Sequence, residues 1–397
     1  MNADLKIQVG GTIAPGRAIY IQRPEDRSLK DSLADGEYAC VFASRQVGKS
    51  SLMLRTALQL KQENWKVAFV DLSTLGSPTN ICTYLSILSS ELAKQLGIKY
   101  DAKSFWSTSV IKSPSQRFKE FVVDVILYKV NCNVAIFLDE VDSTSRFDFT
   151  DDLFLAIRSM YNDRGIDSAL SKIVVCLAGV AQTEELIKDV RATPYNIGIV
   201  IEPSDFNIIR DDLSQLESIL RGGKPNARGV LHRVFYWTDG HPFLTMAVLK
   251  DVTSRSIERP EDVDGLVSER YFESLRRGQD VHFRNVERLL RSRTDEALAT
   301  LRVYERVLKG NRVADEHAAA FRRLRLLGLV KKDAAGLVAV RNRIYERVFD
   351  RRWVKTTVRG IRRVRPAESI LSAVQRIVFQ MLMEAAGAVR SWAGRLG

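Results

Sequence analysis

Residues Gly48, Lys49 and Ser50 form a tripeptide that is typical of loops that bind phosphate groups. In such a loop the glycine lets the backbone approach the phosphates, the lysine reaches the β- and γ-phosphates, and the serine hydroxyl binds Mg²⁺. The full pattern also has a glycine at position 43, where this chain has Ala43. An alanine fits there if its backbone stays in an ordinary conformation. We expect eight residues to surround the phosphates: Ser44, Arg45, Gln46, Val47, Gly48, Lys49, Ser50 and Ser51.

A second group of residues that could take part in chemistry is the pair Asp139 and Glu140, which follows the apolar run "VAIFL". A buried strand that ends this way places the Asp139 carboxylate beside a metal ion, and Glu140 can act as general base toward a water molecule. A strand that ends in two solvated acids explains this pair alone, but it does not explain both patterns in this order. Together they predict a site for ATP or ADP with Mg²⁺, in which Ser50 and Asp139 hold the metal and Lys49 and Glu140 are catalytic.

Short apolar runs and helical patterns alternate between residue 38 and about residue 200. Runs rich in Val, Ile and Phe, without helical periodicity, suit strands that are buried on both faces of a parallel sheet. Their alternation with helical segments predicts an α/β core with crossover helices. The expected strands lie at residues 38–43, 66–73, 133–142 and 172–181.

The strand pattern stops at about residue 205, and helical segments follow. Two further helical segments then precede "LVKKDAAGLVAVRN", in which two apolar runs flank a turn and predict a hairpin. Helix, helix, hairpin is the order of a winged helix. We therefore expect a nucleotide-binding core with an N-terminal adenine-packing segment at 1–204, a helical lid at 205–293, a winged-helix-like domain at 294–354, and a basic linker with an amphipathic C-terminal helix at 355–397.

The composition is that of a soluble globular chain with two or three domains: 397 residues, 45% hydrophobic and 27% charged. No apolar run approaches the roughly 20 residues that span a bilayer, and the N-terminus lacks a signal pattern. The four cysteines form no C-x-x-C pair, so buried free thiols in a reducing compartment explain them best. The sequence therefore predicts a cytoplasmic protein, with the membrane surface or the nucleoid as candidate places of attachment.

Several segments, taken together, resemble a bacterial AAA-like family that is common in cyanobacteria and similar to the STAND ATPases, signal-transduction NTPases that act as ligand-gated switches. The resemblance covers roughly residues 8–354 and implies a P-loop NTPase core with an AAA+/STAND-like parallel sheet, followed by a helical domain and a winged-helix domain. The segments are "YIQRPEDRSL", "SRQVGKSSLM", "VDLSTLG", "FLDEVD", "TPYNIG", "GHPFLT" and "VRNRIYERVF".

Further site residues follow from this resemblance. The segment before the first strand packs against adenine in STAND proteins, which points to Tyr20, Arg23 and Asp26. A surface salt bridge is the alternative for Arg23. The stretch "TDGHPFLT" is similar to the STAND GxP element, so His241 and Pro242 would touch the base or the phosphates and report nucleotide state. The alternative is a plain helix start, because proline suits the first turn.

The resemblance also bears on hydrolysis. The segment "RATPYNIG" offers Arg191 as an arginine finger or sensor, with Arg45 and Arg210 as competitors. In AAA+ ATPases the strand that corresponds to "KIVVCLAGVA" often ends in a polar sensor for the γ-phosphate. Here the residues from Ala178 to Ala181 carry no amide or hydroxyl side chain. Hydrolysis therefore has weaker support than binding.

Positive charge is concentrated near the C-terminus. The net charge is +12, and residues 341–365 hold ten basic residues against two acidic ones. Such a block favours DNA or an anionic membrane surface, although a solvated helix face is the alternative. The tail that follows has an apolar stripe that would serve docking on its own domain, self-assembly or membrane insertion. The stripe comprises Ile370, Leu371, Val374, Ile377, Val378, Met381, Leu382, Ala385, Val389 and Trp392.

Three hypotheses follow. The first is a STAND-like regulatory ATPase that forms homo-oligomers in response to an unknown trigger. The second is a DNA-associated AAA+ ATPase of the origin-recognition or transposition type, which the basic block favours. The third is a nucleotide-binding scaffold with vestigial hydrolysis, which the apolar strand end favours. The stretch "GHP" favours the first hypothesis over the second.

Overall fold

A computed structural model describes most of the chain, in two units defined by their internal contacts. Unit 1 comprises Met1–Tyr271 with Arg325–Leu329 and Asn342–Ile344, and unit 2 comprises the remaining residues. Arg191 and the expected C-terminal helix lie outside the described residues. The described residues are 6–13, 16–107, 112–180, 198–221, 226–273, 280–291, 294–310, 318–332 and 336–362.

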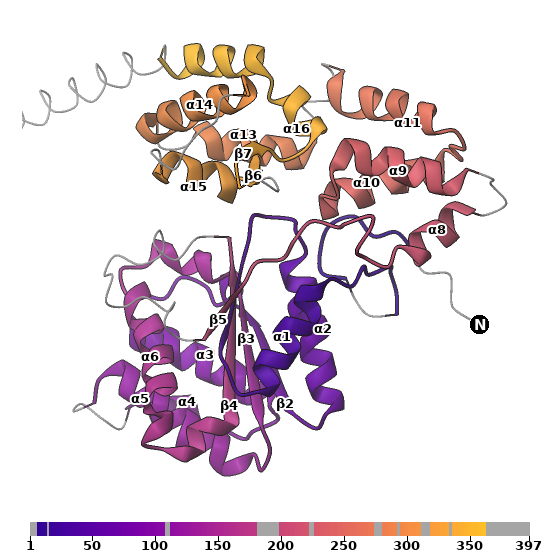
Figure 1. Cartoon of the computed structure of the whole chain (residues 1–397). Helices are drawn as coiled ribbons and strands as arrows, with labels where there is room; N and C mark the ends of the chain where they lie inside the picture. Colours follow the sequence, from indigo (N-terminus) through magenta and orange to yellow (C-terminus); the bar gives the residue numbers. More distant parts are fainter. Residues whose placement is uncertain are drawn as a thin grey trace, which may run out of the picture. The chain divides into compact units, whose positions relative to one another are not determined.

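A five-stranded parallel sheet forms the centre of unit 1, in the order β2-β3-β4-β1-β5 (Figure 1). The four strands expected from the sequence are confirmed, and β5 is an additional, short edge strand. Every residue of β1, β3 and β4 is buried, as expected for strands covered on both faces. The strands are β1 (Ala39–Phe42), β2 (Lys66–Asp71), β3 (Val134–Asp139), β4 (Ile173–Gly179) and β5 (Ile199–Ile201).

Helices cover both faces of this sheet, with α1 and α2 on one side and α3, α5 and α6 on the other (Figure 1). Side chains cap the starts of several of them: for example, Asn80 accepts a hydrogen bond from the N–H of Thr83, and Ser113 forms a capping box with Gln116. The helices are α1 (Pro24–Ala34), α2 (Lys49–Gln62), α3 (Ile81–Gln95), α4 (Ala102–Ser107), α5 (Pro114–Glu120), which continues as a π-helix over Phe121–Leu127, and α6 (Thr150–Asn162).

The outer edge of β2 is occupied by a side chain. The Gln95 amide accepts a hydrogen bond from the Phe69 N–H at 2.7 Å and donates one to the Phe69 carbonyl at 2.9 Å. Gln95 thereby bonds the Phe69 peptide groups as a neighbouring strand would. An occupied edge is less able to pair with another chain.

Predicted helical segments follow the core in unit 1 as far as residue 271, whereas the helix at 281–291, which the expected lid also included, belongs to unit 2. An ionic network joins α9 to α11, because Arg233 donates two hydrogen bonds of 2.6 Å to Asp264 and Trp237 donates one of 2.7 Å to the same carboxylate. The helices are α8 (Ser214–Arg221), α9 (Ala227–Thr238), α10 (Pro242–Ser254) and α11 (Pro260–Val267), which continues as a π-helix over Ser268–Phe272.

Gly240 fixes how the chain enters α10. Its φ is +74°, and a Cβ there would lie 1.9 Å from the Phe206 carbonyl oxygen, so only glycine fits. The Phe206 N–H also donates to the Gly240 carbonyl at 2.9 Å. The linker that leaves β5 is thus held against the start of α10.

Unit 2 contains helices and the expected hairpin, whose strands β6 (Val330–Lys332) and β7 (Val338–Val340) pair antiparallel. In its core His282 forms a 2.6 Å hydrogen bond with the Tyr345 hydroxyl, and burial lowers the His282 pKa to about 4. The winged helix and the four domain boundaries stay predictions. The helices are α13 (Val281–Arg291), α14 (Thr294–Leu308), α15 (Ala318–Leu326) and α16 (Arg343–Val348), and a further helix starts at residue 351 and is described to residue 362.

The cysteines only partly match the expectation of buried thiols. All four are free, and Cys40 and Cys176 are buried, but Cys132 is half-buried and Cys82 is exposed. The expectation is wrong for Cys82, because it lies in the first turn of α3 on the side away from the sheet. In the part of the chain that the structure describes, no helix is long and apolar enough to cross a bilayer.

Candidate functional site

The loop between β1 and α2 has the backbone of a phosphate-binding loop. Gly48 has φ +89° and Gln46 has φ +63°, so the chain turns sharply before α2 begins at Lys49. Ala43 does not have a positive φ. Its methyl group is therefore accommodated without strain, which is the condition under which alanine can replace the usual glycine. The N–H groups of the loop and the first turn of α2 provide a setting that favours anions.

The Lys49 ammonium group lies across this loop. It is buried and donates hydrogen bonds of 3.0 Å to the carbonyl oxygens of Ala43 and Ser44. Burial lowers the pKa of Lys49, and the carboxylates of Glu140 and Asp142 oppose that shift. The lysine therefore lies within the field of the carboxylates that follow β3, which is where the sequence analysis expected the two patterns to meet.

The two predicted acids occupy different environments. Asp139 ends β3, is buried, and accepts a 2.8 Å hydrogen bond from the N–H of Glu140. Glu140 has φ +53° and starts the turn that leaves the strand. Burial raises the pKa of Glu140, and the negative charges of Asp142 and Asp139 add to the increase. A carboxyl group whose pKa is raised toward neutrality is better suited to accept a proton.

Asp142, which is not among the site residues predicted from the sequence, also belongs to this edge of the sheet. Its carboxylate accepts a 2.9 Å hydrogen bond from the N–H of Val180, directly after β4. A Cβ at Gly179 would lie 2.8 Å from Val141 and 3.0 Å from the Asp142 carboxylate. The turn after β3 thus supplies the polar group beside the end of β4. Asp142 is the third acid of "DEVD", and this position in the sequence could have identified it.

A cavity lies beside the loop and is lined from four segments of unit 1. The N-terminal segment contributes Tyr20 and Arg23, and α10 contributes Pro242, three of the residues for which the sequence predicts contact with a nucleotide. Its aromatic and aliphatic walls suit a flat ring system. The complete lining is Gln8, Gly10, Gly11, Ile13, Ile19, Tyr20, Ile21, Arg23, Gln46, Val47, Gly48, Ser51, Phe206, Pro242, Phe243 and Met246.

Other predicted residues lie outside the lining of this cavity. His241 is buried and caps α10, because its Nδ1 accepts a 3.4 Å hydrogen bond from the Leu244 N–H. Ser50 lies in the first turn of α2. Of the arginine-finger competitors, Arg210 is held by Asp211 at 2.7 Å and by the Ser204 hydroxyl at 2.9 Å. Arg45 is exposed at the tip of the loop, and its charge influences both Lys49 and Glu140.

Arg23 is buried, so the surface salt bridge considered from the sequence is wrong. Its guanidinium donates hydrogen bonds of 2.9 Å to the carbonyl oxygens of Val47 and Ser204. It therefore ties the phosphate loop to the linker that leads from β5 into α8.

A small polar network fixes the segment that carries Arg23. The Asp26 carboxylate accepts hydrogen bonds from the Arg23 N–H at 2.8 Å and from the Tyr20 hydroxyl at 2.6 Å. Burial raises the pKa of both Asp26 and Tyr20. Tyr20 also lies under the Arg55 guanidinium, 4.7 Å from its ring centroid, so the network reaches α2.

Replacing Arg23 by alanine should destabilise unit 1 and loosen the loop. The change leaves two carbonyl groups without their donor, at a cost of about 1–3 kcal/mol for each buried group. We expect a loss of about 2–4 kcal/mol of unfolding free energy, together with faster hydrogen exchange of the loop amides. Arg27→Ala, an exposed change in α1, the helix that follows Arg23, is the matched control. Equal effects of the two substitutions would contradict the role of Arg23.

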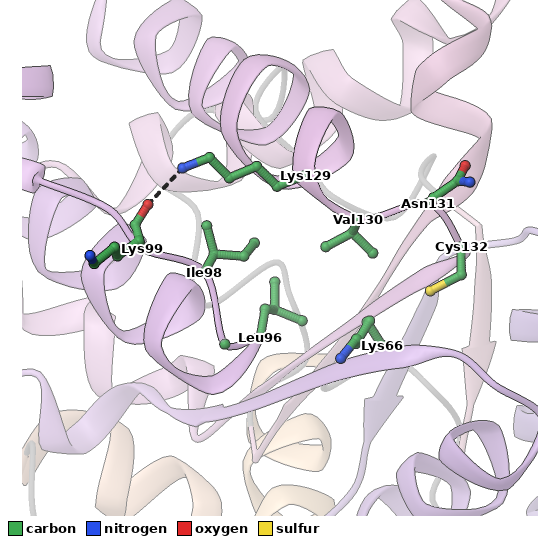
Figure 2. A pocket seen from close by; sticks show the side chains of 9 residues that line it. Lys66, Leu96, Ile98, Lys99, Lys129, Val130, Asn131 and Cys132 are labelled. Carbon is green, nitrogen blue, oxygen red and sulfur yellow. Dashed lines mark hydrogen bonds between the residues drawn. The ribbon is translucent and has the colours of Figure 1, made fainter.

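A second hollow lies at the opposite edge of the sheet (Figure 2). It is bordered by Lys66, the first residue of β2, and by Cys132, just before β3, whereas the phosphate loop follows the carboxyl end of β1. Lys129 donates a 2.7 Å hydrogen bond to the Lys99 carbonyl across its rim. Its lysines are exposed, and the hollow takes no part in the site at the carboxyl edge.

The residues present fit a magnesium nucleotide. Mg²⁺ prefers oxygen ligands, and Asp139 supplies a buried carboxylate while Ser50 supplies a hydroxyl. The Lys49 ammonium, held by two carbonyl oxygens, can exchange them for phosphate oxygens. Within the described residues there is no cluster of three or more His, Cys, Asp or Glu side chains that could hold a metal by itself.

Comparison with known proteins supports this fold. The sequence model of a family described as "AAA-like domain" matches residues 9–351. An uncharacterised WD repeat-containing protein of Synechocystis sp. is 31% identical over 372 residues, which cover 89% of this chain and 31% of that protein. The chain thus spans less than a third of that relative's length.

Two solved structures share the architecture at low sequence identity. A Walker-type ATPase of Pyrococcus abyssi has a TM-score of 0.50 at 15% identity, covering 89% of this chain and 99% of that one. The ORC2 protein of Aeropyrum pernix, solved in ADPNP–ADP complexes, has a TM-score of 0.54 at 14% identity, covering 91% of this chain and 97% of that one. The predicted P-loop ATPase type of core is therefore confirmed as the fold.

Proposed function

Because this chain belongs to the AAA-like domain family, we propose that it is a STAND-like regulatory ATPase. In this proposal it binds ATP or ADP with Mg²⁺ and forms a homo-oligomer in one nucleotide state. The resemblance to STAND switches suggests the regulatory role, and the ADPNP–ADP complexes of the ORC2 structure support nucleotide as the ligand of this kind of fold.

One observation carries the proposal: residues of the phosphate loop and residues of α10 line the same cavity. Val47 and Gly48 come from the loop, whereas Pro242, Phe243 and Met246 come from the helical segment. A bound nucleotide would contact both. Its state would then bias the position of α10, since a ligand shifts a conformational equilibrium by its difference in affinity for the two states.

The chemical roles follow from the geometry of the site. The loop amides and Lys49 would bind the phosphates, and Ser50 with Asp139 would hold Mg²⁺, which neutralises phosphate charge when bound. Glu140 would orient the attacking water and accept its proton. Asp142 would position the end of β4 through the Val180 N–H. Arg45 is the described arginine best placed to add positive charge, because its field reaches Glu140.

Two other functions have a specific observation in their favour. A DNA-associated AAA+ ATPase is favoured by the exposed cations of the helix at residues 351–362. A scaffold with vestigial hydrolysis is favoured by the end of β4, which carries no polar side chain between Ala178 and Val180. Turnover and DNA dependence separate these functions from a nucleotide switch.

Light scattering of the full chain tests the switch. We expect a larger mass with a slowly hydrolysed ATP analogue than with ADP, because only one nucleotide state should favour self-association. The Lys49→Ala variant with the analogue is the control and should keep the mass of the nucleotide-free chain. An equal mass in both nucleotide states would overturn the switch, and a mass that increases only with DNA would favour the DNA-associated ATPase.

A further inference from the structure

The helix at residues 351–362, yellow in Figure 1, docks on unit 2 through an apolar face. Val354, Thr357 and Ile361 are buried, at a spacing that places them on one side of the helix. The half-buried Trp353 donates a 3.2 Å hydrogen bond from its indole N–H to Glu287 in α13, and its ring centroid lies 4.9 Å from that of Phe349. The apolar side chains of this segment are thus used within unit 2.

The opposite face of the same helix is strongly basic, although Thr356 and Gly360 are exposed beside its cations. Five cations are exposed, and none forms an ion pair with another described residue. At 3.6 residues per turn they fall within an arc of about 100°, and they extend over about 16 Å of helix at 1.5 Å per residue. No acidic residue occurs in the segment. This basic ridge consists of Arg351, Arg352, Lys355, Arg359 and Arg362.

We propose that the basic ridge binds the phosphate backbone of a nucleic-acid duplex. Duplex DNA presents one phosphate for each ~1.7 Å of its axis when both strands are counted, so about nine phosphates lie along a 16 Å ridge. The five cations are fewer than these phosphates, so each can meet one on the facing side of the duplex. Guanidinium groups, four of the five here, also bind phosphate oxygens in a bidentate manner. The contact would recognise the charge and the spacing of the phosphates, and it would not distinguish one base sequence from another.

The burial pattern favours a duplex over a membrane. A helix that binds a bilayer surface inserts an apolar face beneath the headgroups. Here Val354 is 1% exposed and Ile361 is 7% exposed, so that face is unavailable. The sequence left DNA and an anionic membrane as alternatives because it shows Val354 and Ile361 among the cations without showing what covers them.

Fluorescence anisotropy with a labelled 20-base-pair duplex and the full chain tests the proposal. If all five cations meet phosphates, log Kobs should fall with log salt concentration at a slope of about −4 to −5, since each contact contributes about −0.9. Lys355→Glu with Arg359→Glu should bring the slope about two units closer to zero and weaken binding by about tenfold or more at 50 mM salt. The wild-type slope in the variant would overturn the proposal.

A matched pair of changes separates the ridge from the overall charge of +12. Lys61→Glu with Lys103→Glu alters the net charge equally, at exposed positions in unit 1, and should leave the slope unchanged. Equal losses in both double variants would overturn a localised ridge. If the charge-reversed variant does not fold, the variant that combines Lys355→Ala with Arg359→Ala decides the test. Its melting temperature should be close to that of the wild type.

Vesicles of phosphatidylglycerol and phosphatidylcholine provide the alternative ligand. At the same salt concentrations, the fraction of the wild-type chain that sediments with the vesicles should not exceed the fraction of the variant that combines Lys355→Glu with Arg359→Glu. Vesicle binding that depends on the ridge, together with duplex binding that does not, would overturn the proposal in favour of a membrane.

Discussion

Replacing Lys49 by alanine is expected to abolish the stabilisation that Mg-ATP gives the wild-type chain. Nucleotide at 100 times its dissociation constant should add about 2.7 kcal/mol to the unfolding free energy of the wild type. The ammonium group makes charge-assisted bonds of about 1.5–3 kcal/mol each, so its loss should remove binding in this concentration range. Thermal unfolding with and without Mg-ATP measures the difference.

The comparison must use the nucleotide-induced change, because Lys49 also bonds the carbonyl oxygens of Ala43 and Ser44 within the loop. Its removal therefore lowers the stability of the chain without nucleotide as well. Lys61→Ala, an exposed change later in α2, is the control and should keep the full shift. A shift of wild-type size in Lys49→Ala would show that the loop is not the phosphate site.

Replacing Glu140 by glutamine should slow ATP hydrolysis by about 100-fold or more while ATP binding is kept. General base catalysis contributes about 10²–10⁴-fold to a rate, and an amide of nearly the same shape cannot accept the proton. Burial and the negative charges of Asp142 and Asp139 disfavour the ionised form of Glu140. Glutamine carries no charge, so the fold should tolerate the change. Phosphate release and thermal shift report the two quantities separately.

Glu258→Gln is the matched control for this experiment, because Glu258 is exposed in the loop between α10 and α11 and should have the wild-type rate. Unchanged hydrolysis in Glu140→Gln would exclude Glu140 as the base. Absence of turnover in the wild type, with binding intact, would instead favour the nucleotide-binding scaffold.

The local features of the fold were predictable from the sequence. Runs of β-branched and aromatic residues identified four strands, and the chemistry of glycine and lysine identified the phosphate loop. The short strand β5 was missed because its three residues form too short a run to show a pattern. The order of the strands depends on pairing between distant segments, which residue patterns do not contain.

Side-chain partners from distant segments were beyond prediction for the same reason. Arg23 bonds the carbonyl of Ser204, 181 residues further along the chain. Phe206 and Met246 enter the cavity because the entry to α10 is packed against the linker, and nothing in their own sequence neighbourhoods marks them. Asp142 was the exception, since it follows Glu140 by two residues and could have been included with the acids.

The same distinction applies to the basic segment. Its charge was visible in the sequence, but the side of the helix that unit 2 covers was not. Burial of Val354 and Ile361 turns a mixed basic and apolar run into a helix with one docked face and one charged face. That division is what favours a phosphate backbone over a lipid surface as its partner.

Equilibrium dialysis of the full chain against labelled ATP with Mg²⁺ is the most direct test of the nucleotide site, because it measures binding without depending on stability or turnover. We expect saturable binding of about one ATP per wild-type chain and little binding to Lys49→Ala at the same ATP concentration. Binding to the wild type that does not exceed binding to Lys49→Ala would contradict a nucleotide site at this loop.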